Sequence, residues 1–382
     1  MRRRAYKKRS RRRIAAGAKL IRIARERGFT DGYNVGRSSG YHFGICGALF
    51  GKYAQATYPI RDIHVMYVAT GLGVPYSPID EAVVESLSKM VSRLTVCVPT
   101  ANISEIAQRE RPDLMLVLNG MNFNKTHAEQ VRKLGIRTAV WLTDDPYYTD
   151  ATADFVPSYD YAFTLELSCV AFYRDLGCKN VHYLPFANDF RIYRPTPVDP
   201  SKRVDILFIG SGYWNRVRFF DSIAPYLSNK SVMIAGWWWD RLQNYRLLEN
   251  KIRLGLWMTP QETAQFYNGA KIVINLHRAH DDESYNKNSR KVPAHSVNPR
   301  TFEISGNGAF QLSDVRLDLQ NYYTPGAEIA TYESPEEMIQ KIDYYLAHED
   351  ERLHIARKGL KRTLSDHTYE KRLDALLSTI FG

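Results

Sequence analysis

The chain has 382 residues, which is long for one domain and comfortable for two. Hydrophobic residues make up 44% of it and aromatic residues 12%, so large cores can form. The cysteines at 46, 97, 169 and 178 form no Cys-x-x-Cys pair, which argues against a zinc site or a disulfide framework. With no apolar run of membrane-spanning length and no apolar stretch after the basic start, we expect a cytoplasmic protein without a signal peptide.

The net charge of +11 belongs to the beginning of the chain. Residues 1–27 contain 13 Lys and Arg against one acidic residue, Glu26, so the rest of the chain carries one net negative charge. This distribution argues against a nucleic-acid-binding groove in the body. The basic segment is suited to an anionic surface, such as a membrane, a nucleic acid or an acidic protein; the alternative is a flexible solubilising tail.

We assign residues 1–58 to a basic, glycine-rich N-terminal arm. Residues 1–13 are expected to be disordered, and residues 14–27 can form a helix. Glycines then recur every four residues from Gly28 to Gly44. Because glycine costs about 1 kcal/mol per helical position, this stretch favours a helix only if it packs tightly against another surface.

Residues 59–192 predict a first Rossmann-like domain. An apolar run at 63–69 leads into a turn with Gly71 and Gly73 and then a helix over 79–92, which is a nucleotide-type crossover. This turn is the predicted acceptor side of a cleft. Strands and helices are expected to alternate after it, at 95–98, 103–109, 114–118, 125–134, 138–142, 161–165, 168–176 and 181–184.

Asp144 and Asp145 follow the strand predicted at 138–142, where open parallel sheets place their sites. One of them is a candidate catalytic base for an acceptor hydroxyl, and the alternative is that one caps the next helix. Their spacing differs from a metal-binding Asp-x-Asp. The polar loop at 277–297 crowds its His and acidic residues together without support elsewhere, so we predict no metal site.

After a proline-rich connector, a second Rossmann-like domain is expected over 193–365. It opens with a strand that runs into Gly210 and Gly212, and Asn215 and Arg216 begin the following helix. Exposed backbone N–H groups with an arginine suit a diphosphate, whereas the alternative is a solvated arginine beside a tight turn. His277 or Arg278 ends a later strand that faces the cleft, so a substrate contact is predicted there, at the start of a loop that is expected to be mobile and able to close on substrate.

The stretch from Asn298 to Asp314 predicts a turn, a short helix with Arg300 and Glu303, a glycine break at Gly306 and a buried strand. A carboxylate on this helix can accept from both ribose hydroxyls, while Arg300 and the helix N-terminus can face a diphosphate. Gly306 would let a ligand approach closely. The alternative is an ordinary helix–turn–strand link with a surface ion pair.

This stretch, Asn-x-Arg-x-Phe-Glu-Ile-x-x-x-Gly-Ala-Phe with a following Asp, resembles the C-terminal signature of group 1 glycosyltransferases, in the CgeB/YkvP-like branch of spore maturation proteins. The resemblance implies an α/β GT-B fold, with two Rossmann-like doubly wound domains facing a central cleft and a last helix, 366–382, that crosses back. Glu303 matches the family's ribose-binding glutamate. The family's other donor-pocket glutamate falls at His295.

The resemblance therefore predicts a hexosyltransferase-like enzyme that moves a sugar from a nucleoside-diphosphate sugar, of UDP or dTDP type, to an unknown acceptor without a required cofactor. It also implies a role in spore surface-layer glycosylation, in the mother cell or at the spore. His295 favours an alternative, a non-catalytic GT-B-like binding or scaffold protein. A second alternative is a nucleic-acid-associated protein that uses the arm. The predicted nucleotide and donor residues are Gly210, Gly212, Asn215, Arg216, His277, Asn298, Arg300, Glu303 and Gly306.

Overall fold

The computed structural model describes residues 2–54, 57–282 and 284–382. Contacts within the chain divide it into two units, Met1–Ala48 and Leu49–Gly382. Most of helix α1 (Arg2–Tyr53) forms the first unit, so the disorder expected for residues 1–13 is wrong. The helix also runs through the glycine stretch, and at each glycine from Gly28 to Gly51 a Cβ would have open space around it. The tight packing that the glycine spacing predicts is not formed here.

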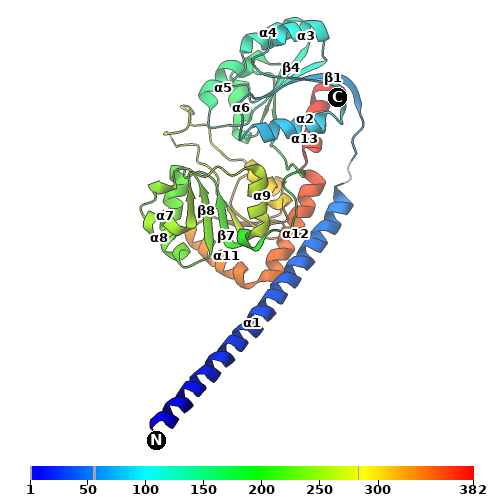
Figure 1. The fold of residues 1–382 in the computed structure, drawn as a ribbon. Coiled ribbons are helices and arrows are strands. Elements are labelled where there is room, and N and C mark those ends of the chain that lie inside the picture. The colour runs from blue at the N-terminus through cyan, green and yellow to red at the C-terminus, as the bar shows by residue number, and fades with distance from the viewer. Residues whose placement is uncertain (1, 55–56, 283) are drawn as a thin grey trace. The chain divides into compact units, whose positions relative to one another are not determined.

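The second unit contains two parallel sheets of six strands, each at the centre of a three-layer domain (Figure 1). Buried apolar runs build both sheets, as expected for parallel strands covered on two faces. The first sheet has the order β2-β1-β3-β4-β5-β6 and the second the order β12-β11-β10-β7-β8-β9. The strands are β1 (Arg61–Val68), β2 (Val91–Cys97), β3 (Leu114–Leu118), β4 (Arg137–Trp141), β5 (Tyr161–Thr164), β6 (Asn180–Tyr183), β7 (Val204–Ile209), β8 (Val232–Gly236), β9 (Ile252–Leu254), β10 (Ala270–Asn275), β11 (Gln311–Asp314) and β12 (Ala330–Tyr332).

Helices connect the strands and cover both faces of each sheet, which confirms the predicted doubly wound α/β class. The helices of the first half are α2 (Ser77–Leu87), α3 (Ile103–Glu110), α4 (Lys125–Lys133), α5 (Thr149–Phe155) and α6 (Leu167–Asp175). Those of the second half are α7 (Trp214–Ser228), α8 (Tyr245–Leu248), α9 (Pro260–Gly269), α10 (Pro299–Gly306), α11 (Pro335–Ala347), α12 (Glu349–Asp366) and α13 (Tyr369–Phe381).

The last helix, α13, belongs to the core of the first domain. It lies beside α2 on one face of the first sheet (Figure 1). Its Leu373, Leu376 and Leu377 are fully buried and pack into the same cluster as Tyr67 and Trp141 of that sheet. The chain therefore returns from the second domain to the first between α12 and α13.

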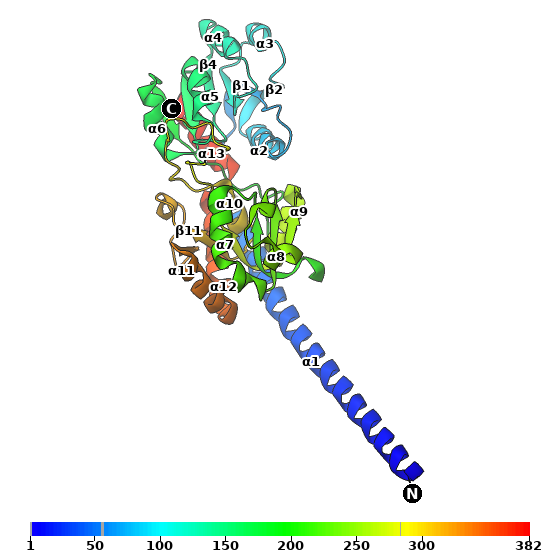
Figure 2. The same cartoon turned by 90° about the vertical axis from the view of Figure 1, so that its left-hand side faces the viewer.

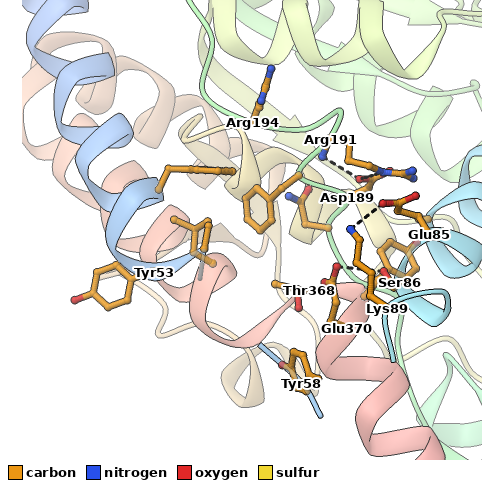
Figure 3. Close-up of a pocket in the computed structure, with 17 residues that line it drawn as sticks. Tyr53, Tyr58, Glu85, Ser86, Lys89, Asp189, Arg191, Arg194, Thr368 and Glu370 are labelled. Carbon is orange, nitrogen blue, oxygen red and sulfur yellow. Dashed lines mark hydrogen bonds and ion pairs between the residues drawn. The ribbon is translucent and has the colours of Figure 1, made fainter. Parts of the chain in front are cut away.

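The two segments that connect the domains lie side by side. The backbone N–H of Asn188, in the first connector, donates to the carbonyl of His367 at 2.9 Å, and Asn188 forms a parallel bridge with Thr368. From α13, the Nε of Arg372 donates to the carbonyl of Pro185 at 3.1 Å. A pocket of about 290 Å³ lies beside these segments, and the residues that line it are drawn in Figure 3.

The main difference from the predicted elements of the first domain lies after α2. The helix predicted over 79–92 ends at Leu87, because the backbone N–H groups of Lys89 and Met90 turn back to the carbonyls of Ser86 and Leu87. β2 then begins at Val91, earlier than predicted. The strands β9 and β12, three residues each at the outer edges of the second sheet, are too short to show a hydrophobic period and were not predicted.

Leu373→Ala in α13 is expected to destabilise the protein by about 2–5 kcal/mol, because it leaves a cavity in the first domain's core. Chemical denaturation followed by Trp fluorescence measures the loss. Thr379→Ala, on an exposed position of the same helix, is the control and is expected to change stability little. Equal stabilities of the two variants would contradict the assignment of α13 to this core.

Candidate donor and acceptor site at the facing sheet edges

Two arginines converge on the turn after β7. A Cβ at Gly210 would lie 3.1 Å from Nη1 of Arg216 and 3.4 Å from Nη1 of Arg300. Arg216 comes from the first turn of α7 and Arg300 from the first turn of α10. Figure 2 shows α10 at the end of the second domain that faces the first. Glycine is required at position 210 if both guanidinium groups are to stay close to the turn.

Arg216 is only 3% exposed and is held by backbone carbonyls. Its Nε donates to Leu276 at 2.9 Å and its Nη1 to Ser211 at 3.0 Å. Burial, followed by the neighbouring Arg300, lowers the pKa of Arg216 to about 9. Within the described part of the chain, Arg300 makes no hydrogen bond or ion pair. Among the described residues no carboxylate forms an ion pair with either arginine, although the charges of Glu303 and Asp314 act on them, so this turn suits a phosphate group.

Glu303 lies one turn further along α10, with its side chain half-buried. Burial raises the pKa of Glu303 to about 7, while Arg300 opposes this rise. Burial and then the charge of Glu303 raise the pKa of Tyr193, Tyr267 and Tyr369, so the carboxylate lies among these three rings. No hydrogen bond to this carboxylate is formed within the described residues, which leaves it available to hydroxyl donors of a ligand.

Asn298 caps α10, because its Oδ1 accepts from the backbone N–H of Thr301 at 3.1 Å. His277 holds this cap in place. Its Nε2 accepts from the backbone N–H of Asn298 at 2.9 Å, so Nδ1 carries the proton and donates to Asp314 at 2.5 Å. Burial lowers the pKa of His277, which favours this neutral tautomer. The predicted substrate contact through the His277 ring is therefore corrected: both ring nitrogens are used to position α10.

Asn215 supports the same region. Its Nδ2 donates to the carbonyl of His277 at 2.8 Å and its Oδ1 accepts from the backbone N–H of Ala279 at 3.3 Å. Asn215 therefore orients the chain after β10, and its amide is not directed to a ligand.

Two of the glycines predicted to admit a ligand pack against protein. A Cβ at Gly212 would lie 2.9 Å from the carbonyl oxygen of Trp238. At Gly306 it would lie 2.4 Å from the side-chain amide of Asn188. These glycines let chain segments approach each other, so the expected ligand contact is corrected for both.

On the first domain, Gly71 and Gly73 form the exposed turn after β1, both with left-handed backbone (φ +67° and +68°). Asp80 in α2 holds the turn. It accepts from the Oγ1 of Thr70 at 2.7 Å and from the hydroxyl of Tyr67 at 2.6 Å. The turn is thus a rigid, exposed element at the carboxyl edge of the first sheet.

The neighbouring aspartates have different surroundings. Asp145 is 2% exposed, and its two oxygens accept from Thr164 at 2.6 Å and Tyr173 at 2.7 Å. Burial raises the pKa of Asp145 to about 7. Asp144 is half-buried and accepts from the hydroxyl of Tyr76 at 3.1 Å. Asp144 also accepts from Thr143 at 2.5 Å and from the amide of Asn119 at 3.1 Å, so its greater exposure, and not a lack of internal partners, makes Asp144 the better candidate for contact with substrate.

The loop from His277 to Val297 is fastened to the first domain, which corrects the expected mobile lid. Lys287 donates its backbone N–H to Tyr147 at 2.7 Å and accepts from the N–H of Asp150 at 2.9 Å. Asp150 also accepts from the hydroxyl of Ser289 at 2.7 Å. These bonds form a short backbone ladder between the two domains.

Glu166 is a buried carboxylate that the sequence did not identify as important. It accepts from the backbone N–H groups of Ser168 at 3.0 Å, His295 at 3.1 Å and Ser296 at 3.1 Å. The side chain of His295 is exposed, and only its backbone takes part. A polar residue directly after the buried strand β5 was the available signal. Glu166 connects the first domain to the loop that leads into α10.

Among the described residues, no group of three or more His, Cys, Asp or Glu side chains is arranged to hold a metal ion. In the same part of the chain, no helix is both long enough and apolar enough to cross a bilayer.

Comparison with known proteins identifies relatives of this chain. Residues 216–378 match the family of glycosyl transferase-like domains. Over 318 residues, the chain is 28% identical to spore protein CgeB of Bacillus subtilis strain 168, covering 83% of this chain and 98% of CgeB. The chain is thus similar to CgeB over most of the length of both proteins. The resemblance found in the signature around Glu303 is thus confirmed.

Solved structures agree with the fold of this chain. HepE of Anabaena, in complex with UDP and glucose, aligns with a TM-score of 0.60 at 10% identity, over 83% of this chain and 99% of HepE. A glycosyltransferase of Rickettsia africae aligns with a TM-score of 0.55 at 11% identity, over 84% and 100% of the two chains. Sucrose-phosphate synthase of Thermosynechococcus elongatus gives 0.55 at 9% identity, over 84% and 99%. The predicted GT-B fold is confirmed.

Glu166→Gln is expected to destabilise the protein by about 1–3 kcal/mol, because the amide nitrogen cannot accept from the backbone N–H groups that the carboxylate serves. Denaturant titration measures the change in the free energy of unfolding. Glu81→Gln, on an exposed position of α2, serves as the matched control. If Glu166→Gln unfolds at the wild-type midpoint, Glu166 does not fasten the loop.

Proposed function

We propose that this CgeB-like protein is a glycosyltransferase that uses a nucleoside-diphosphate sugar. One observation carries the proposal: Arg216 of α7 meets Arg300 of α10 at Gly210, neither has an ion-pair partner among the described residues, and α10 also carries Glu303. The match to glycosyl transferase-like domains supports it. HepE, whose fold is shared, has been solved with UDP-glucose.

The spacing on α10 fits the nucleoside end of such a donor. Arg300 and Glu303 are three residues apart, so they lie on one face of the helix about 5–6 Å from each other. A diphosphate between Arg216 and Arg300 would leave the adjoining ribose beside Glu303, whose carboxylate can accept from both ribose hydroxyls. The base is of the UDP or dTDP type in this proposal, and no further cofactor is required.

The reaction needs charge stabilisation at one end of the sugar and a proton acceptor at the other. As the bond from C1 to the diphosphate breaks, its electron pair stays on the diphosphate, where the two arginines stabilise the developing charge. The acceptor hydroxyl attacks C1 and its proton passes to Asp144. The acceptor enters along the exposed turn at Gly71 and Gly73.

The biological role follows from the relative. CgeB is a spore protein, and this supports the proposal that the acceptor belongs to a spore surface layer and that the enzyme acts in the cytoplasm of the mother cell or at the spore. Residues 1–27 are proposed to contact an anionic surface. The side chains of residues 19–37 are exposed, while those up to residue 18 lie outside the described ones.

A scaffold protein that binds the nucleotide without turnover is the second candidate. It is favoured by His295, which stands where the family carries a second glutamate, and whose side chain points to solvent. A donor-hydrolysis assay separates the two functions. Tight nucleotide binding without hydrolysis or transfer of any sugar nucleotide would support the scaffold.

Glu303→Ala is expected to weaken UDP or dTDP binding about 10-fold to 100-fold, because it removes the acceptor for two ribose hydroxyls. Isothermal titration measures the Kd. Glu336→Ala, on an exposed position at the start of α11, is the control and should bind like the wild type. Equal affinities of both variants would contradict the placement of the ribose.

Nucleotide binding is also expected to depend on pH. The pKa of Glu303 is about 7 in the free protein, and hydroxyl donors favour its ionised form, so affinity should rise between pH 6 and pH 8 with release of a proton. Titrations in two buffers of different ionisation enthalpy count the protons. Glu303→Gln should remove this dependence. A pH-independent wild type would indicate that the carboxylate does not take part.

A further inference from the structure

Arg278 lies where the two domains meet. It follows His277 after β10, and its guanidinium group packs on the ring of Tyr213 at 4.1 Å and on the ring of Tyr147 at 4.4 Å. Tyr147 belongs to the first domain and Tyr213 to the second. The hydroxyl of Tyr147 also donates to the backbone carbonyl of Arg278 at 3.1 Å. Arg278 is therefore fixed on both sides of the domain junction.

One donor of this guanidinium group is unused. The Nε of Arg278 is buried and has no hydrogen-bond partner. Its Nη2 donates to the side-chain oxygen of Asn286, and within the described residues no carboxylate lies in ion-pair distance. An unsatisfied buried donor costs about 1–3 kcal/mol, and more when it is charged, so the site is organised for an acceptor atom that the chain does not supply.

Arg278 connects the two halves of the proposed site. The ring of Tyr213 that carries Arg278 also lies 5.4 Å from the guanidinium carbon of Arg216, so both cations pack on one ring. On the other side, the charge of Arg278 lowers the pKa of Asp144 and opposes the effect of burial. Arg278 thus stands between the proposed diphosphate position and the proposed base.

We propose that Arg278 is a further catalytic residue, whose free Nε–H contacts the diphosphate oxygen that leaves C1 of the sugar; this rests on the proposed function. When the C1–O bond breaks, the oxygen keeps the electron pair and Arg278 stabilises its charge. The acceptor oxygen forms the new bond to C1, and its proton goes to Asp144.

Arg278 has a different task from the other two arginines. Arg216 and Arg300 face the turn at Gly210, where the diphosphate already carries its charge in the bound donor. Arg278 meets the oxygen on which new charge appears only as the bond breaks. An interaction that strengthens in the transition state raises kcat and contributes little to ground-state affinity.

The test compares Arg278→Gln, Arg278→Lys and Arg216→Gln with Arg218→Gln, a control on an exposed position of α7. The full chain is used, with UDP and dTDP for binding and with UDP-, dTDP-, GDP- and ADP-sugars for turnover. For Arg278→Gln we expect a Kd for the nucleotide within threefold of the wild type and a kcat at least 100-fold lower. Arg216→Gln should lose binding, and the control should behave as the wild type.

The pH profile provides a second readout. Asp144 is faced by the hydroxyls of Tyr76 and Thr143, the amide of Asn119 and the cation of Arg278, with Asp145 next to it. Removing the cation of Arg278 should raise the pKa of Asp144, so the acid limb of the pH profile of kcat should shift to higher pH. Arg278→Lys keeps the charge but lacks the Nε–H. It should therefore return the acid limb of the pH profile to its wild-type position without restoring the wild-type kcat.

Two results would overturn the inference alone: a kcat for Arg278→Gln within fivefold of the wild type, or a loss of nucleotide affinity as large as that of Arg216→Gln. A wild type that binds no nucleotide and turns over no donor would overturn the proposed function itself, and with it the role of Arg278. If Arg278→Gln does not fold, as judged by thermal unfolding, Arg278→Lys carries the same comparison of kcat with Kd.

Discussion

The close approach of Arg216 and Arg300 at the β7 turn is the feature on which the proposed donor site depends. Two carbonyl groups hold Arg216 beside its neighbour, and the β7 turn leaves room for both cations only because it has no side chain at Gly210. The turn in turn packs closely on the end of β8, where a Cβ at Gly236 would lie 2.4 Å from the carbonyl oxygen of Gly210.

Hydrogen bonds to backbone groups also hold the junction between the two domains. Glu166 accepts N–H groups of the loop that leads to α10, and the chain around Lys287 pairs with the start of α5. Hydrogen bonds of this kind fix the orientation of the loop relative to the first domain and bury little apolar surface. The loop between them contains Arg278 and leads into α10, so its attachment positions both.

The sequence was most informative where a residue's role depends on its own helix. Arg300 and Glu303 share one short helix, so their common face follows from helical spacing alone, and the doubly wound class follows from the alternation of apolar strands and helices. The sequence was least informative where either of two adjacent residues at a strand end could face the site. Asp144 and Asp145, or His277 and Arg278, differ in which side chain the strand end turns inward, and this depends on partners that other elements supply, such as Tyr173 for Asp145 and Tyr147 for Arg278. Periodicity carries no information about such contacts.

The glycines illustrate the same limit. Their positions in the sequence indicate that another group packs closely against the glycine, but not whether this group is a ligand or protein. Gly306 packs against Asn188, and Gly212 packs against the backbone of Trp238. Likewise, the low helix propensity of the arm did not prevent one continuous helix from Arg2 to Tyr53, because propensity is a weak prior over a long segment.

The position of α13 has a consequence for biosynthesis. The strands of the first sheet are complete when Tyr183 has left the ribosome, yet the apolar face that α2 shares stays uncovered until residues 369–381 emerge. The nascent chain must therefore carry an unfinished first domain through the translation of the whole second one. The first domain is therefore synthesised first, but its core is completed only when α13 has been made.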